Sequence, residues 1–262
     1  ASFKSIEKLS TMVKFYDKYQ INNINIPCKS YLKKDLLNKS IEYITNRLPN
    51  ISLIPHYSLF YQSNRNLNQS LDYLKDFIRF SLKKNVEQVL IISGSKKKSN
   101  IDTLIALQHL IRIKDISERK CIGIAYNPYL KREEANIEKL RLEEKISSGL
   151  ISSIWLQFGI ESELLDKGIM FIERMISKYK YSNNPINIYG SVFIPSRKFL
   201  ASFKFRSWKG IYLSEEFLDS PERARDITRN LLIKYRCLNI IPFIESNVSK
   251  EKDLTYLTEY FE

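Results

Sequence analysis

Glycine is scarce in this chain. The 262 residues include only seven glycines, whereas glycine usually makes up about 7% of a protein. Their positions are 94, 123, 149, 159, 168, 190 and 210. These positions fit neither the GxGxxG pattern of dinucleotide-binding loops nor the GxxxxGK pattern, followed by Ser or Thr, of phosphate-binding loops. The common nucleotide-binding loops are therefore excluded.

Cysteine and histidine are also scarce. Cys28, Cys121 and Cys237 lie far apart without a CxxC pair, and the two histidines form no HExxH motif. We therefore expect neither a disulfide framework nor a metal site. This use of cysteine favours an intracellular, reducing compartment, either the cytoplasm or an organellar matrix.

Long apolar runs are missing as well. No stretch reaches the roughly 18 apolar residues of a membrane-spanning helix, so we expect no membrane span. Hydrophobic residues still make up 44% of the chain, enough to bury a large core. The length of 262 residues suits one α/β barrel domain, which typically needs about 250 residues.

Acidic residues are outnumbered by basic ones. The chain has 42 Lys and Arg against 29 Asp and Glu, a net charge of +13. The basic residues are spread over every segment, and no RNA-binding-domain, zinc-knuckle or basic-zipper pattern is present. We therefore do not expect a nucleic-acid partner. A weaker alternative is a basic barrel that binds RNA through its lysine-rich surface.

Short β-branched runs alternate with longer helical patterns. The pattern predicts strands at 21–26, 51–59, 87–93, 121–126, 151–157, 186–194 and 239–244. It predicts helices at 5–19, 67–84, 133–149, 163–179 and 220–236. In the last of these, Ser220 is the expected N-cap and Pro221 suits the first turn. Strands that alternate with helices in this way form a parallel sheet.

This alternation and the length predict one domain over residues 1–262, folded as a (β/α)8 barrel. Seven strands are counted, and the chain opens with a helix. The eighth strand is therefore expected either in the segment GIYLS at 210–214 or upstream of Ala1.

Carboxylates are rare at the predicted carboxyl ends of the strands, where the active site of a barrel forms. Glu245 is the only one there, so neither a carboxylate pair nor a Ser–His–Asp set can be assembled. The strand ends favour binding of a flat, hydrogen-bonding ligand. Gly94, Ser95 and the lysines at 96–98 are the best candidate for an anion cradle, with a solvated lysine turn as the alternative.

Other strand-end residues have both a ligand-binding and a structural interpretation. His56 lies in an apolar strand, where a core histidine is favoured over a ligand contact. Gln157 ends a very apolar strand, and because a buried amide needs partners, a ligand-facing role is favoured. Tyr126 and Tyr129 fit ring stacking and simple packing equally well.

The order of these motifs resembles the methylenetetrahydrofolate reductase family of flavin-dependent (β/α)8 barrels. The segments that carry the resemblance are IPHYS at 54–58, VEQVLIISGS at 86–95, CIGIAYNP at 121–128, RLEEKISSGLISSIWLQF at 141–158 and INIYGSVFIP at 186–195. The resemblance spans nearly the whole chain, and the shared order and spacing of the motifs carry it.

The resemblance implies FAD as cofactor, contacted by residues that match the family's motifs: His56, Gly94, Ser95, Tyr126 and Lys145. It implies that Gln157 lies near a folate-type substrate. Ser95 stands where the family has an acidic residue, and Ser93 stands where it has an arginine. The strand that carries the family's catalytic glutamate is expected upstream of Ala1 or is lost, so we assign no catalytic residue.

Two functions follow from the resemblance. The first is a flavin-dependent oxidoreductase of folate one-carbon metabolism, a divergent relative of methylenetetrahydrofolate reductase. The alternative is a catalytically degenerate barrel that serves as a binding or assembly subunit, either as a homo-oligomer or with a protein partner. The scarcity of strand-end acids favours the alternative, whereas His56, Tyr126 and Gln157 favour the oxidoreductase.

Overall fold

A computed structural model of the protein describes residues 5–29, 34–63, 66–93, 101–181, 185–246 and 248–261. The chain divides into two compact units. Unit 1 comprises Ala1–Ile124 and Ser147–Ser152, and unit 2 comprises Ala125–Ile146 and Ser153–Glu262. All seven predicted strands are confirmed within the described residues, in the sheet order β1-β2-β3-β4-β5-β6-β7. The α/β class with parallel strand pairs is therefore confirmed.

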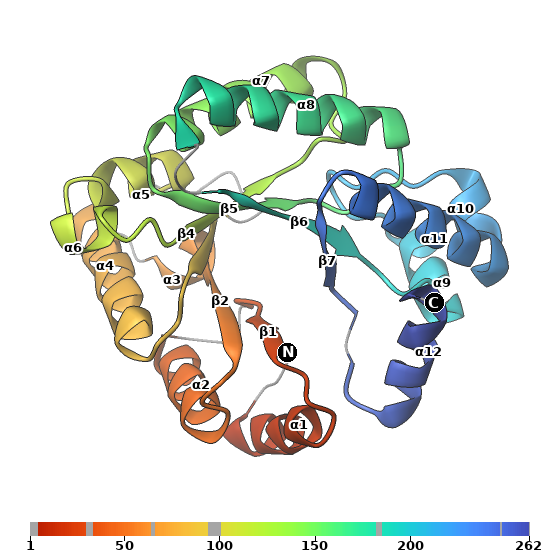
Figure 1. The fold of residues 1–262 in the computed structure, drawn as a ribbon, viewed down its shortest axis with the longest axis horizontal. Helices are drawn as coiled ribbons and strands as arrows, with labels where there is room; N and C mark the ends of the chain where they lie inside the picture. The colour runs from red at the N-terminus through yellow and green to blue at the C-terminus, as the bar shows by residue number, and fades with distance from the viewer. Residues whose placement is uncertain are drawn as a thin grey trace. The chain divides into compact units, whose positions relative to one another are not determined.

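Unit 1 alternates helices with strands (Figure 1). In chain order its elements are α1 (Ile6–Lys18), β1 (Asn23–Ile26), α2 (Lys34–Arg47), β2 (Ser52–Ser58), α3 (Leu59–Gln62), α4 (Leu67–Lys83), β3 (Val89–Ile92), α5 (Thr103–Leu110) and α6 (Lys114–Ser117), followed by the first part of β4 (Ile122–Tyr126). The predicted helices at 5–19 and 67–84 are confirmed as α1 and α4.

Each strand of unit 1 turns alternate side chains to opposite faces of the sheet. Tyr57 of β2 packs its ring against Phe77 of α4, with 5.0 Å between the ring centroids, so this face of the sheet lies against the helices. His56, the neighbour of Tyr57, faces the opposite side and pairs with Leu90 of β3. Because that face is also closely packed, His56 is buried.

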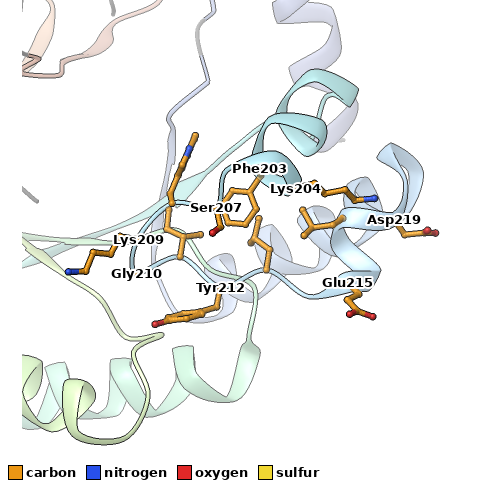
Figure 2. Close-up of a pocket in the computed structure, with 12 residues that line it drawn as sticks. Phe203, Lys204, Ser207, Lys209, Gly210, Tyr212, Glu215 and Asp219 are labelled. Carbon is orange, nitrogen blue, oxygen red and sulfur yellow. The ribbon is translucent and has the colours of Figure 1, made fainter.

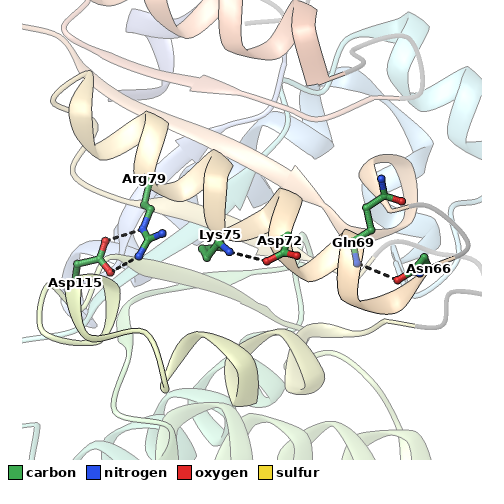
Figure 3. Close-up of polar contacts among 6 residues, drawn as sticks. All are labelled: Asn66, Gln69, Asp72, Lys75, Arg79 and Asp115. Atoms are coloured by element: carbon green, nitrogen blue, oxygen red, sulfur yellow. Dashed lines mark hydrogen bonds and ion pairs between the residues drawn. The ribbon is translucent and has the colours of Figure 1, made fainter.

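Side-chain contacts fix the start of α4 and join it to α6 (Figure 3). The Asn66 side chain accepts a hydrogen bond from the Gln69 backbone N–H at 3.1 Å, which caps the helix. Further along α4, the Arg79 guanidinium donates two 2.8 Å hydrogen bonds to the Asp115 carboxylate. This fork geometry sets the orientation of α6 on α4.

Unit 2 continues the alternation of helices and strands. Its elements are the end of β4, α7 (Arg132–Ser147), β5 (Ile151–Leu156), α8 (Ser162–Lys178), β6 (Asn187–Val192), α9 (Arg197–Phe205), α10 (Glu215–Asp219), α11 (Pro221–Cys237), β7 (Ile241–Ile244) and α12 (Glu251–Phe261). The predicted helices at 133–149, 163–179 and 220–236 are confirmed as α7, α8 and α11. As predicted, the Ser220 side chain caps α11 by accepting from the Arg223 N–H at 3.2 Å.

One face of β5–β7 packs against α11. Trp155, Tyr189 and Ile241 pair across β5, β6 and β7, and so do Leu156, Gly190 and Pro242 in the next row. A Cβ atom built on Gly190 would lie 2.4 Å from the Tyr235 ring of α11. Gly190 therefore lets α11 approach the sheet closely, and the row of Trp155 faces the other way.

The segment 210–214 is not a strand within the described residues, which corrects one of the two expected places for an eighth strand. Gly210 has a left-handed φ of +78°. Its carbonyl accepts a 2.8 Å hydrogen bond from Nδ2 of Asn127. A side chain therefore holds this backbone in place of a strand partner, and the segment buries Ile211.

Candidate ligand-binding site

The face of β5–β7 that points away from α11 repeats one pattern on three strands. Each strand places an aromatic residue two positions before a polar one: Trp155 and Gln157, Tyr189 and Ser191, and Phe243 and Glu245. Because side chains two apart share a face, three rings and three polar groups gather on one side of unit 2. We call the rings the aromatic floor, and we call Gln157, Ser191 and Glu245 the polar row.

The aromatic floor is tightly packed. The rings of Trp155 and Tyr189 stack at 4.1 Å with an interplanar angle of 14°, and Phe243 meets Trp155 edge-on at 5.0 Å. The indole N–H of Trp155 donates to the Ser153 hydroxyl at 2.8 Å. A buried indole with a satisfied N–H is held rigidly, so the floor gives a preformed apolar wall.

The polar row lies at the carboxyl ends of the strands. The Gln157 backbone N–H donates to the Tyr126 carbonyl at 2.8 Å, and the Glu245 N–H donates to the Val192 carbonyl at 2.9 Å, so both residues extend the sheet beyond its last paired residues. The Gln157 side-chain oxygen accepts from the Phe158 N–H at 3.2 Å. Glu245 is exposed and Gln157 is half-buried. A ligand can therefore reach both groups.

Ser191 lies between the two neighbouring strands. Its hydroxyl lies 2.9 Å from the Leu156 carbonyl and also makes a short contact with Oε1 of Glu245. A hydroxyl has one proton to donate, so Ser191 donates either to the Leu156 carbonyl or to the Glu245 carboxylate. The Ser191 hydroxyl therefore positions the Glu245 side chain in the polar row.

Tyr126 and Lys145 both lie near Glu138 at the end of β4. Tyr126 is buried, and a Cβ atom built on Gly168 of α8 would lie 3.5 Å from its ring. Burial, with a smaller contribution from Glu138, raises the pKa of Tyr126 to about 12. Nζ of the buried Lys145 donates to the Ala125 carbonyl at 3.0 Å and lies 3.9 Å from the Glu138 carboxylate. Both side chains are thus engaged within unit 2.

The other residues expected near a cofactor are not found beside Tyr126 and Lys145 in the described part of unit 2. His56 belongs to unit 1. Gly94, Ser95 and the lysines at 96–98 lie outside the described residues. Of the six residues named from the resemblance, only Gln157 lies in the polar row.

Burial holds His56 in its neutral form. It lowers the pKa of His56 from 6.5 to about 3. The unfolded chain therefore binds a proton that the folded chain excludes, and stability falls as the pH drops below about 6.5. We expect the free energy of unfolding to lose about 1.4 kcal/mol per pH unit from this group between pH 6.5 and 3.

Urea unfolding of the protein and of His56→Asn across this pH range measures that loss. The difference in unfolding free energy between the two proteins should shrink steadily as the pH falls. His109→Asn is the matched control, because His109 is only half-buried on α5. A constant difference between the protein and His56→Asn over the whole range would contradict this expectation. It would show that His56 takes up its proton as readily in the folded state as in the unfolded state.

Four residues of the site went unnoticed in the sequence: Trp155, Tyr189, Ser191 and Phe243. The available signal was the aromatic residue followed two positions later by a polar residue on three successive strands. That repeat marks one face of a sheet, and because it is spread over three strands, the last residues of any one strand do not show it.

In the ranges given above, no group of three or more His, Cys, Asp or Glu side chains is placed to hold a metal ion. Across the same part of the chain, no helix combines the length and apolar character needed to cross a membrane.

Comparison with known proteins gives fold-level similarities only. No protein-family model and no curated protein matches the chain. Among solved structures, it is similar to an uncharacterized protein from Clostridium thermocellum that binds two copies of 5-methyl-5,6,7,8-tetrahydrofolic acid, with a TM-score of 0.45, 15% identity, and coverage of 91% of this chain and 92% of that one. It is also similar to a putative 2,5-diketo-D-gluconic acid reductase B, with a TM-score of 0.48, 10% identity, and coverage of 97% and 78%.

Proposed function

We propose that the chain binds a tetrahydrofolate-type ligand at the polar row of β5–β7. We further propose that it acts as a flavin-dependent oxidoreductase of folate one-carbon metabolism, in a fold of the (β/α)8 type, as its sequence resemblance to the methylenetetrahydrofolate reductase family implies. The observation that carries the proposal is the polar row of Gln157, Ser191 and Glu245 beside the aromatic floor.

The chemistry of the polar row suits a pterin. A pterin is a flat ring system with an amide N–H and an amino group on one edge, and a carboxylate can accept both hydrogen bonds at once. Glu245 supplies that carboxylate, and the amide of Gln157 both donates and accepts. Ligand sites commonly combine apolar walls with a few placed polar groups of this kind.

The described residues fit a flavin less well than a folate. The Lys145 ammonium is held by the Ala125 carbonyl and Glu138. Tyr126 packs against α8. Neither side chain would reach a cofactor without leaving these contacts. This arrangement favours a second candidate, a degenerate member that binds the folate-type ligand as a binding or assembly subunit without reducing it.

The absorption spectrum separates the two candidates. The purified protein is examined for flavin bands, incubated with FAD, freed of excess FAD and examined again. Tetrahydrofolate and 5-methyltetrahydrofolate are then titrated by calorimetry. Flavin bands together with folate binding support the oxidoreductase. Folate binding by a protein that stays colourless supports the binding subunit. A protein that binds neither compound contradicts both candidates.

A further inference from the structure

A second cluster of aromatic and basic side chains lies on α9 and the turn after it. Between residues 195 and 214 the chain has five cations and no acidic residue. In the same stretch stand the aromatic residues Phe199, Phe203, Phe205, Trp208 and Tyr212. Lys204, Arg206 and Lys209 alternate with the rings and form no ion pair within the part of the chain that is described.

Part of this cluster borders a hollow of about 790 Å³ (Figure 2), namely Phe203, Lys204, Trp208, Lys209 and Tyr212. Phe203, Trp208, Ile211, Leu213 and Leu218 supply its apolar lining. Trp208 and Tyr212 are each 41% exposed, so both rings are accessible from solvent. Accessible ring surface beside a concave, partly apolar hollow is suited to a flat ligand.

Packing holds Trp208 in place. Its ring meets those of Phe193, Phe199 and Phe203 edge-on, with centroids 5.2, 5.8 and 5.9 Å away. The turn that follows is fixed by the hydrogen bond from Asn127 to the Gly210 carbonyl at 2.8 Å. The exposed part of the indole is therefore a preorganised surface. A ligand that stacks there loses little binding free energy to ordering of the side chain.

Charges of both signs border the hollow. Lys204 comes from α9 and Lys209 from the turn after it, and Glu215 and Asp219 come from α10. Figure 2 shows Lys204 near Asp219, with Lys209 at the other end of the hollow. A matching ligand therefore combines anionic groups with hydrogen-bond donors.

We propose that this hollow binds single-stranded nucleic acid. Unstacked bases lie against Trp208 and Tyr212, phosphates follow the cations of α9, and base amino groups reach the carboxylates of α10. Single strands are commonly bound by this combination of stacking rings and a basic track, and acidic side chains accept hydrogen bonds from base amino groups. This site goes beyond the folate proposal and does not depend on it.

The shape of the hollow argues against a membrane, the other large partner for rings and cations. Phe205, 93% exposed, would suit a membrane surface. However, a membrane-inserting surface protrudes into the lipid, whereas Trp208 and Tyr212 border a hollow. The scattered charge of the whole chain argues against a nucleic-acid partner, whereas this proposal rests on the local cluster at residues 195–214.

Fluorescence anisotropy with labelled RNA and DNA oligonucleotides tests the proposal. The variants are Trp208→Ala, and Lys204→Gln combined with Lys209→Gln. The matched control is Lys114→Gln combined with Lys167→Gln, because it removes the same charge from exposed lysines of α6 and α8. Vesicles of phosphatidylglycerol and phosphatidylcholine are the membrane arm, and circular dichroism confirms that each variant is folded.

We expect binding that weakens with salt. Removing Lys204 and Lys209 should lower the slope of log affinity against log salt by about 1.4, since each phosphate contact on a single strand contributes about 0.7. Trp208→Ala should weaken binding at least about fivefold with an unchanged slope. The RNA and DNA arms show which strand is preferred.

Three results would overturn the proposal. The first is no binding to either oligonucleotide. The second is binding that the control variant weakens as much as the Lys204 and Lys209 variant, which would assign the affinity to overall charge. The third is binding to the vesicles alone.

Discussion

Glu245→Gln should weaken binding of tetrahydrofolate by about 10- to 100-fold. A hydrogen bond to a charged group contributes about 1.5–3 kcal/mol, and each 1.4 kcal/mol is a factor of about ten in affinity. Glutamine keeps the size of the side chain and its contact with the Ser191 hydroxyl but has only one acceptor oxygen. The pterin edge therefore loses one of its two acceptors and the attraction of the charge.

The control for this prediction is Glu173→Gln, an exposed acid on α8 of the same unit. Calorimetric titration of the protein and both variants gives the three dissociation constants. The control should bind as the unchanged protein does. An affinity for tetrahydrofolate that Glu245→Gln leaves intact would show that the ligand lies elsewhere.

Gly190→Ala should lower the free energy of unfolding by about 3 kcal/mol. The new Cβ atom would lie 2.4 Å from Cε2 and Cζ of Tyr235 and 2.8 Å from Cγ2 of Ile240. These neighbours are buried, and the Tyr235 hydroxyl also donates to the Ser191 carbonyl at 3.2 Å. Overpacking of a filled core costs about 1–3 kcal/mol, and the rigid ring places this site at the upper end.

Urea unfolding measures this loss, and Gly149→Ala is the matched control. Nothing lies within 4 Å of a Cβ atom at Gly149, where φ is +75°. Its cost is therefore limited to backbone strain of about 1 kcal/mol. Combining Gly190→Ala with Tyr235→Leu should recover part of the loss, since the two positions are in contact. Equal losses at Gly149 and Gly190 would contradict the close packing of α11 on β6.

The strands and most long helices could be predicted because their signals are local. The apolar runs at 121–126 and 151–157 became β4 and β5, and Ser220 with Pro221 marked the start of α11. The segment GIYLS resembles these runs in its apolar residues, yet it is not a strand within the described residues. The side chain of Asn127, distant in sequence, donates a hydrogen bond to its backbone. Composition cannot show such a long-range contact.

The candidate site could be predicted only in part. Gln157 and Glu245 stand at strand ends and were recognisable there. Their relation to Ser191 depends on the pairing register of three strands, because a shift of one residue would turn Ser191 to the opposite face. Tyr126 and Lys145 also stand near a strand end, but contacts with α8 and with Glu138 set their directions.

The fluorescence of Trp155 tests the ligand site most directly. The chain has two tryptophans, so in Trp208→Phe the only indole is that of the aromatic floor. Titration of this variant with tetrahydrofolate should change Trp155 emission saturably, with the dissociation constant that calorimetry gives, and Glu245→Gln should shift the midpoint to higher ligand concentration. Calorimetric binding that leaves Trp155 emission unchanged would contradict a ligand site on β5–β7.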